Sequence, residues 1–303
     1  MQISTSQLYD RSTAFMQKLS QKADALQNQV SSTVKFTAPS DDVVAYQRLA
    51  GLKQGKADDA AAGANVTLAQ SLLQQSDTTL TAVQNALQSA SELVLQAGNG
   101  TLTDANRATI ATQLKGVLDN LVGLANTTDA RGQPLFGAAT GDSAVTVGTD
   151  GTVSFTGTGS PAAIPIGGDQ QIVATDTAAR VFGGIATASG TSDVFAIISK
   201  FAAALNAGGS VTAAAKEAGN ALTAAQTQVT SVQGSVGARA ARLELVSSQL
   251  TDTAANRETG RSALEDTDVT AAITELQKTM TILSATQASF TKLSQLSLFD
   301  YLK

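Results

Sequence analysis

Two segments, one near each end of the chain, carry apolar residues at coiled-coil spacing. Between Asp268 and Lys303 the stripe consists of Val269, Ile273, Leu276, Met280, Leu283, Phe290 and Leu293. Near the N-terminus it consists of Leu8, Phe15, Leu19, Leu26 and Val30, at spacings of seven, four, seven and four. Each pattern predicts an amphipathic helix with one apolar stripe. Such a helix is marginal in water by itself, so each stripe needs a partner.

The last residues of the chain continue this apolar character. Leu296, Leu298 and Phe299 follow the stripe directly, where chain ends are usually polar and frayed. Their presence favours docking against another surface.

Longer helical patterns lie between these segments. Apolar and small residues alternate at spacings of three and four over residues 66–97, 110–124 and 222–250. Gly51, Gly55 and Gly63 predict a weak, interrupted start to the first of these helices. Pro39 and Ser40 predict a break and a new helix start before it. Gly98-Asn99-Gly100 then predicts a short turn into an antiparallel helix that Thr103 caps.

The period changes to two in a segment rich in Gly and Thr. Val145 and Val147 alternate with polar residues, Asp150-Gly151 is a turn signal, and Val153 and Phe155 alternate again, which predicts a β-hairpin. Ile164, Ile166, Ile172 and Val173 predict two further short strands. Asp193 or Ser192 then opens a short helix through Ala204.

The order of these patterns predicts a mainly α protein with a β insertion. We expect an elongated antiparallel helical rod with terminal coiled-coil strands and a small β domain at the far end. The predicted domains are a terminal coiled coil (residues 1–40 and 268–303), a helical rod (41–137 and 192–267) and an inserted β domain (138–191).

Composition excludes several classes of function. The 303 residues include no Cys and no His, which removes thiol chemistry, the common nucleophile-base pairs and the usual zinc ligands. The net charge is -5 and Lys and Arg are scattered, so neither nucleic acid nor an anionic membrane is an expected partner. We find no catalytic, cofactor-binding or metal-binding motif. The adjacent Asp41 and Asp42 fit a helix start better than a metal site. No apolar run approaches 18 residues, so no membrane insertion is expected.

Four short motifs resemble the flagellin superfamily. They are residues 3–9 (ISTSQLY), 39–42 (PSDD), 135–137 (LFG) and 294–302 (SQLSLFDYL). The paired motifs at both ends are the specific signal. The form of the termini resembles the junction proteins between hook and filament more than flagellin itself.

This resemblance implies an extracellular structural component of the bacterial flagellum, exported through the flagellar type III apparatus without a cleaved Sec signal. The implied partners are further copies in a ring, hook-associated protein 1, flagellin and an export chaperone. We expect the terminal stripes to lack a partner in the isolated chain and to form the assembly interface, which comprises Leu8, Phe15, Leu19, Leu26, Val30, Val269, Ile273, Leu276, Met280, Leu283, Phe290, Leu293, Leu296, Leu298 and Phe299.

Two alternatives stay open at this point. A flagellin-type filament subunit would share the fold. The inserted β domain could instead carry a surface adhesin or ligand-binding role.

Overall fold

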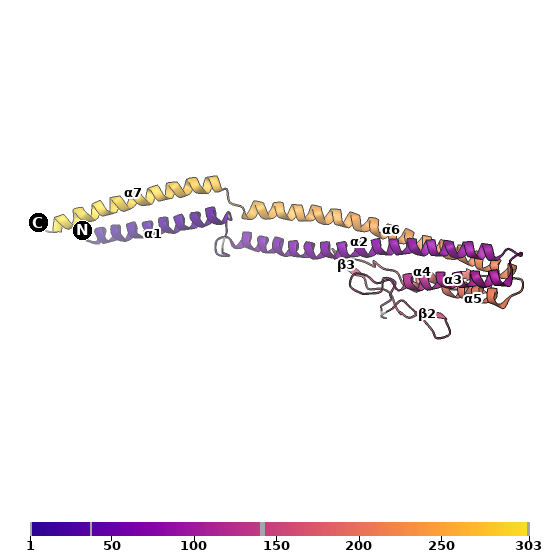
Figure 1. The fold of residues 1–303 in the computed structure, drawn as a ribbon. Helices are drawn as coiled ribbons and strands as arrows, with labels where there is room; N and C mark the ends of the chain where they lie inside the picture. The colour runs from indigo at the N-terminus through magenta and orange to yellow at the C-terminus, as the bar shows by residue number, and fades with distance from the viewer. Residues whose placement is uncertain (1, 37, 140–142, 302–303) are drawn as a thin grey trace. The chain divides into compact units, whose positions relative to one another are not determined.

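A computed structural model describes residues 2–36, 38–139 and 143–301 of the chain, and for residues 2–6, 8 and 293–301 it describes the helix without the side chains. The helices of the described residues are α1 (Gln2–Ser32), α2 (Val43–Ala97), α3 (Asp104–Ala125), α4 (Ala178–Phe182), α5 (Val194–Ala207), α6 (Thr212–Glu265) and α7 (Val269–Tyr301) (Figure 1). Short antiparallel hairpins accompany them. The predicted class, mainly α with a β insertion, is confirmed.

The chain forms two compact units, to which α2 and α6 both contribute. The terminal unit contains residues 1–57 and 252–303, and the central unit contains residues 58–251. The predicted boundaries between terminal and rod domains, at residues 40–41 and 267–268, lie in the breaks between helices (residues 33–42 and 266–268) and differ from the boundaries of these units.

Within the central unit α2 and α6 run antiparallel, and polar side chains fix their register. Gln84 donates to the Gln226 carbonyl at 3.0 Å, and Gln233 donates to Thr81 Oγ1 at 3.3 Å. α3 returns along α2, because Gln75 near the middle of α2 donates to the carbonyl of Thr128, just beyond the end of α3, at 2.8 Å. The predicted antiparallel pair is therefore confirmed.

The predicted helix starts at Thr103 and Asp193 are also confirmed. Thr103 accepts a hydrogen bond from the backbone of Asn106, and Asp193 accepts one from the backbone of Ala196. Each cap satisfies one of the backbone donors that an α-helix leaves free at its N-terminus.

Within its described residues, the inserted segment contains three two-stranded sheets. They pair β1 (Val145–Val147) with β2 (Val153–Phe155), β3 (Ile164–Gly167) with β4 (Gln170–Ile172), and β5 (Ile185–Thr187) with β6 (Gly190–Ser192). The first two match the predicted strands, although β4 ends one residue before Val173. The third hairpin was not predicted because Ile185 is the only large apolar residue of its strands, and α4 was not predicted because five residues are too short for a helical period. Asp169 and Gly168 both have positive φ and form the turn between β3 and β4.

The large apolar core lies in the central unit. It joins α2, α3, α5 and α6 to the bases of the hairpins, and Phe136, Phe182 and Phe195 are fully buried within it. Phe182 meets Phe136 edge-on with ring centroids 6.1 Å apart, an orientation that aromatic pairs favour.

An ion cluster around a buried aspartate attaches the inserted segment to α6. Asp176, which is 4% exposed, pairs with both Arg180 and Arg239. Arg239 also donates to the carbonyl of Val173 at 2.7 Å. Arg239 thus pairs with an aspartate in the loop before α4, because the inserted segment covers that face of α6.

Two local expectations at the start of α2 are wrong. α2 is continuous through Gly51, Gly55 and Gly63, since packing in both units outweighs their weak helix propensity. Its cap is Asp42 rather than Ser40, because Asp42 accepts hydrogen bonds from the backbone N–H groups of Val44 at 3.0 Å and Ala45 at 2.9 Å.

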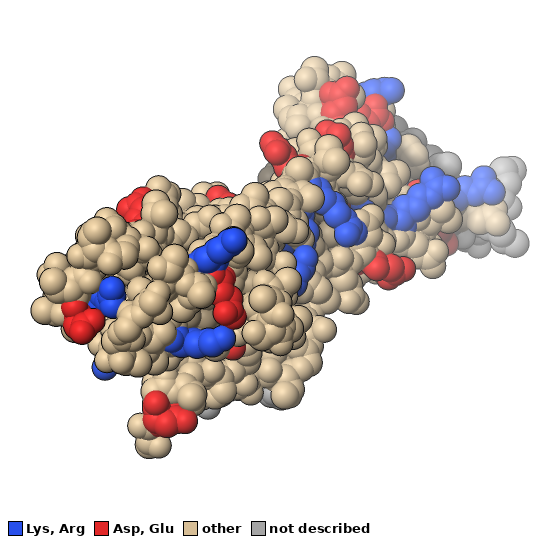
Figure 2. Space-filling view, turned by 90° about the vertical axis from the view of Figure 1, so that its right-hand side faces the viewer, with Lys and Arg blue, Asp and Glu red and all other residues tan. Residues whose placement is uncertain are grey.

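Charged side chains are sparse on the face shown in Figure 2, where they stand singly or in small mixed groups. Among the described residues, no helix combines the length and the apolar character needed to cross a membrane.

Candidate assembly interface

The terminal helices α1 and α7 pack side by side in the single chain (Figure 1). Tyr9 and Phe290 meet edge-on with ring centroids 5.3 Å apart, and Lys22 pairs with Glu275 at 2.5 Å. Since the earlier residue of α1 meets the later residue of α7, the pair is antiparallel. The expectation that the terminal stripes lack a partner outside an assembly is therefore wrong.

Among the side chains that the structure describes, this pairing buries only small ones. Among the described side chains of α1 and α7, those classed as buried are Ala23, Ala272 and Thr279, at 6%, 7% and 2% exposure. Small residues let two helix backbones approach closely, while larger neighbours remain at the flanks of the contact. Two helices alone have too little surface to enclose their large apolar residues.

The side chains that the sequence assigns to assembly fall into three groups. Phe15, Ile273 and Met280 are exposed, at 49%, 39% and 53%. Half-buried beside the α1–α7 contact are Leu19, Leu26, Val30, Val269, Leu276, Leu283 and Phe290. The side chains of Leu8, Leu293, Leu296, Leu298 and Phe299 lie outside the described part of the structure. Ile282, 38% exposed on α7, extends the exposed group and was missed, because it lies off the strict seven-residue repeat.

The two connections between helices pair with one another. Val34 and Asp266 form an antiparallel bridge. The Lys35 N–H donates to the Glu265 carbonyl at 2.7 Å, and the Thr267 N–H donates to the Thr33 carbonyl at 2.9 Å. These bonds tie the break before α2 to the break before α7, so the N-terminal and C-terminal connections form one joint.

A row of ion pairs continues from this joint along α2 and α6. Lys53 pairs with Glu265 at 3.2 Å, Lys56 pairs with Glu258 at 3.1 Å, and Arg261 bridges both glutamates at 2.9 Å and 2.7 Å. In each pair between helices the lysine comes from the N-terminal part of the chain and the glutamate from the C-terminal part, as in the pair of Lys22 with Glu275.

These contacts lower the pKa values of the glutamates. The hydrogen bond from Arg261 is the main cause of the lowered pKa of Glu265, and burial opposes it. Hydrogen bonds from Arg261 and Lys56 lower the pKa of Glu258, and the hydrogen bond from Lys22 lowers that of Glu275. All three carboxylates are therefore held in their charged form in the folded terminal unit.

α2 and α6 approach closely where these ion pairs lie. A Cβ atom added to Gly55 would stand 1.6 Å from the guanidinium of Arg257, and Gly260 faces Leu52. Gly55 is buried and Arg257 is half-buried. The glycine thus provides the space in which Arg257 crosses α2.

Comparison with known proteins agrees with this architecture. The model of the bacterial flagellin N-terminal helical region matches residues 3–140, and that of the bacterial flagellin C-terminal helical region matches residues 220–302. The chain belongs to the flagellin family. These regions include α1, α2 and α3 on one side, and most of α6 and α7 on the other. Residues 141–219, which hold the hairpins, match neither model.

Relatives similar over most of the chain are flagellar hook-associated proteins. The chain is 26% identical over 316 residues to flagellar hook-associated protein 3 of Salmonella typhimurium, covering 99% of each. It is 27% identical over 291 residues to flagellar hook-associated protein 3 of Escherichia coli, covering 91% of each. These relationships confirm the prediction of a flagellar structural protein that is not an enzyme.

A solved structure shares the fold. Hook-associated protein 3 from Legionella pneumophila superposes with a TM-score of 0.65 at 16% identity, over 70% of this chain and 98% of that one. At this level of identity the likeness concerns the fold alone.

Proposed function

We propose that this protein is an adaptor at the hook-filament junction and that it polymerises through α1 and α7. The observation that carries the proposal is the incomplete burial of the terminal helix pair. Phe15, Ile273 and Met280 remain exposed although α1 and α7 already contact one another. Neighbouring copies would cover these side chains, and each Å² of apolar surface removed from water contributes about 25 cal/mol.

The names of the relatives support the proposed location and neighbours of this chain. Those relatives are called hook-associated proteins, and the proposed neighbours of this chain are accordingly hook-associated protein 1, flagellin and further copies of itself. Export through the flagellar type III apparatus, with a chaperone holding the terminal helices, completes the proposal. Phe15, Ile273 and Met280 supply exposed apolar surface that such a chaperone would bind.

Substitution of the exposed stripe tests the proposal. Phe15→Asp combined with Met280→Asp places charges on surface that is already exposed, so the isolated chain should keep its helical content in circular dichroism. In cells lacking the native protein, the variant should leave hooks without filaments in electron micrographs, because a buried unpaired carboxylate strongly opposes the assembled contact.

Val147→Asp provides the matched control. Val147 is 57% exposed on β1 in the central unit, outside the proposed interface, so filaments should form normally. The proposal fails if the Phe15 and Met280 variant still supports filaments. Seeding of the purified wild-type protein separates the filament-subunit alternative, because a filament subunit would grow long polymers visible by electron microscopy whereas an adaptor would stop at a short ring.

A further inference from the structure

Among the described residues, the most exposed large apolar side chain is a leucine in the central unit. Leu95, near the end of α2, is 81% exposed. Glu92 lies one turn earlier on the same face of α2 and is also exposed. Its carboxylate accepts a hydrogen bond from Gln88 and forms no ion pair within the described part of the chain. A single exposed leucine is common on protein surfaces, so its meaning depends on a complementary site elsewhere.

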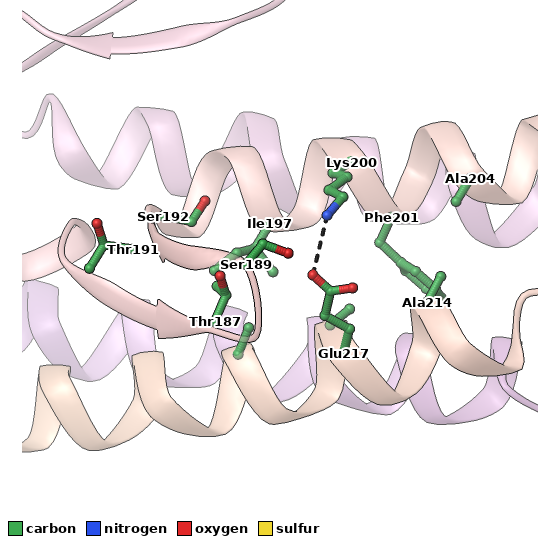
Figure 3. A pocket seen from close by; sticks show the side chains of 12 residues that line it. Thr187, Ser189, Thr191, Ser192, Ile197, Lys200, Phe201, Ala204, Ala214 and Glu217 are labelled. Carbon is green, nitrogen blue, oxygen red and sulfur yellow. Dashed lines mark hydrogen bonds and ion pairs between the residues drawn. The ribbon is translucent and has the colours of Figure 1, made fainter.

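Such a site exists between α5, α6 and the β5–β6 hairpin (Figure 3). This cavity, of about 190 Å³, has an apolar floor that includes Ile197, Phe201 and Ala218. By comparison, a cavity of about 150 Å³ lined by apolar side chains accommodates benzene. The space is therefore sufficient for a leucine side chain.

The rim of the cavity is polar. Lys200 and Glu217 point toward one another across it and pair at 3.2 Å (Figure 3). The Lys200 side chain is 73% exposed, so its ammonium group can also donate to a second carboxylate. Thr187, on the hairpin side, donates to the carbonyl of Gly190.

Leu95, on α2, lies beside one face of α6, and the cavity lies beside the opposite face of that helix. The cavity is lined by Ala214, Ala218 and Ala221 of that helix. The groove beside Leu95 is lined by a different set, Thr212, Ala215, Lys216, Gly219, Asn220 and Thr223. At 3.6 residues per turn these two sets point in roughly opposite directions. Leu95 therefore cannot reach the cavity of its own chain.

We propose that Leu95 of one copy seats in this cavity of a second copy, with Glu92 beside Lys200. A projection on one face and a matching cavity on the opposite face define a heterologous contact, which repeats from copy to copy and forms a ring or a helix according to the rotation between copies. The apolar floor receives the leucine, and the lysine on the rim complements the carboxylate one turn away on the incoming helix. This inference rests on the proposed function and adds a second contact, in the central unit, to that of the terminal helices.

Cysteine crosslinking of the full chain tests the contact. The native sequence contains no cysteine, so every disulfide formed would report the introduced pair. Leu95→Cys with Ala204→Cys, a cavity-lining position, should give a ladder of dimers, trimers and longer species on a non-reducing gel after mild oxidation, because each copy carries both halves. Each single variant should stay monomeric. Absence of the ladder, or dimers from Leu95→Cys alone, would overturn the heterologous contact.

Measurements of self-association test whether Leu95 contributes through the proposed contact or only as an exposed apolar side chain. Leu95→Ala should weaken self-association in sedimentation equilibrium by at least about tenfold, since burial of a leucine side chain exceeds the 1.4 kcal/mol that corresponds to a factor of ten. Leu245→Ala is the matched control, because Leu245 is 73% exposed on α6 and lines no described cavity. It should leave association unchanged. Equal effects of the two substitutions would contradict the proposal.

A charge exchange provides a second arm. Glu92→Lys should weaken association, and the addition of Lys200→Glu should restore it. If the double variant associates no better than Glu92→Lys, the pairing of these two residues is wrong.

These outcomes are distinguishable from failure of the proposed function. If the crosslinks are absent while the Phe15 and Met280 variant still abolishes filaments, the central contact is wrong and the adaptor proposal stands. If the ladder forms but the wild-type protein is missing from hook tips in immunogold micrographs, the self-contact stands and the adaptor proposal is wrong.

Discussion

Gly55 shows how a single residue positions two helices. The position would otherwise favour alanine, because glycine in a helix interior costs about 1 kcal/mol. In the terminal unit, however, Arg257 of α6 occupies the space in which a Cβ atom of residue 55 would stand. The glycine thus exchanges local helix propensity for close contact between α2 and α6.

Two alanine substitutions compare the gain in helix propensity with the cost of displacing Arg257. Gly51→Ala, four residues earlier with nothing within 4 Å of its added Cβ atom, should raise the stability of the terminal unit by up to about 1 kcal/mol. Gly55→Ala should gain the same propensity but lose part of it through displacement of the Arg257 guanidinium, so it should stabilise the unit less than Gly51→Ala does. Hydrogen exchange in the first turns of α2 measures both. Equal stabilisation by the two substitutions would show that Arg257 moves aside without cost.

At the scale of elements, the stability of the terminal unit depends on the ionisation of three glutamates. Glu258, Glu265 and Glu275 all have a pKa below the ordinary glutamate value of 4.5. Because folding lowers these pKa values, the ionised carboxylates stabilise the terminal unit above pH 4.5, and that contribution is lost as the pH falls through the folded-state pKa values.

Acidification below pH 4.5 should therefore loosen the pairing of α1 with α7. Spin labels on Ser20→Cys and Gln277→Cys, both exposed, would report the change as a broader distance distribution. Glu275→Gln should show broadening already at pH 7 and a smaller further change on acidification, since Lys22 has lost its charged partner. A distribution that stays equally narrow from pH 7 to pH 3 would indicate that packing alone holds the pair.

The long elements could be predicted from the sequence. The seven-residue repeats around Leu276 and Leu87 extend over several turns and predict the long helices. The alternation of apolar and polar residues from Val145 predicts the first hairpin. α4 and the β5–β6 hairpin could not be predicted in this way, because α4 is too short to show a helical period and Ile185 is the only large apolar residue of the two strands, so no alternation marks them. The same limit applies to the Asp176–Arg239 pair and to the cavity beneath Lys200, which join residues that no local pattern connects.

At the scale of the whole molecule, the two units differ in the amount of apolar core. All residues of the large core cluster lie between positions 66 and 250, within the central unit. Among the described side chains of the terminal unit, the buried apolar ones are Ala23, Ala45, Leu49 and Ala272. Free energy of unfolding follows buried apolar area, so the terminal unit should be the less stable of the two.

Removal of α7 tests this division of stability. A chain lacking residues 269–303 loses the partner of α1 but none of the core cluster, so the central unit should melt within a few degrees of its temperature in the full chain. Calorimetry of the full chain should show an additional transition at lower temperature that the truncated chain lacks. Incorporation at the hook should be lost. A single cooperative transition in the full chain, shifted by more than about 10 °C on truncation, would instead mean that α7 stabilises the central unit, and the loss of incorporation could then no longer be assigned to the terminal helices.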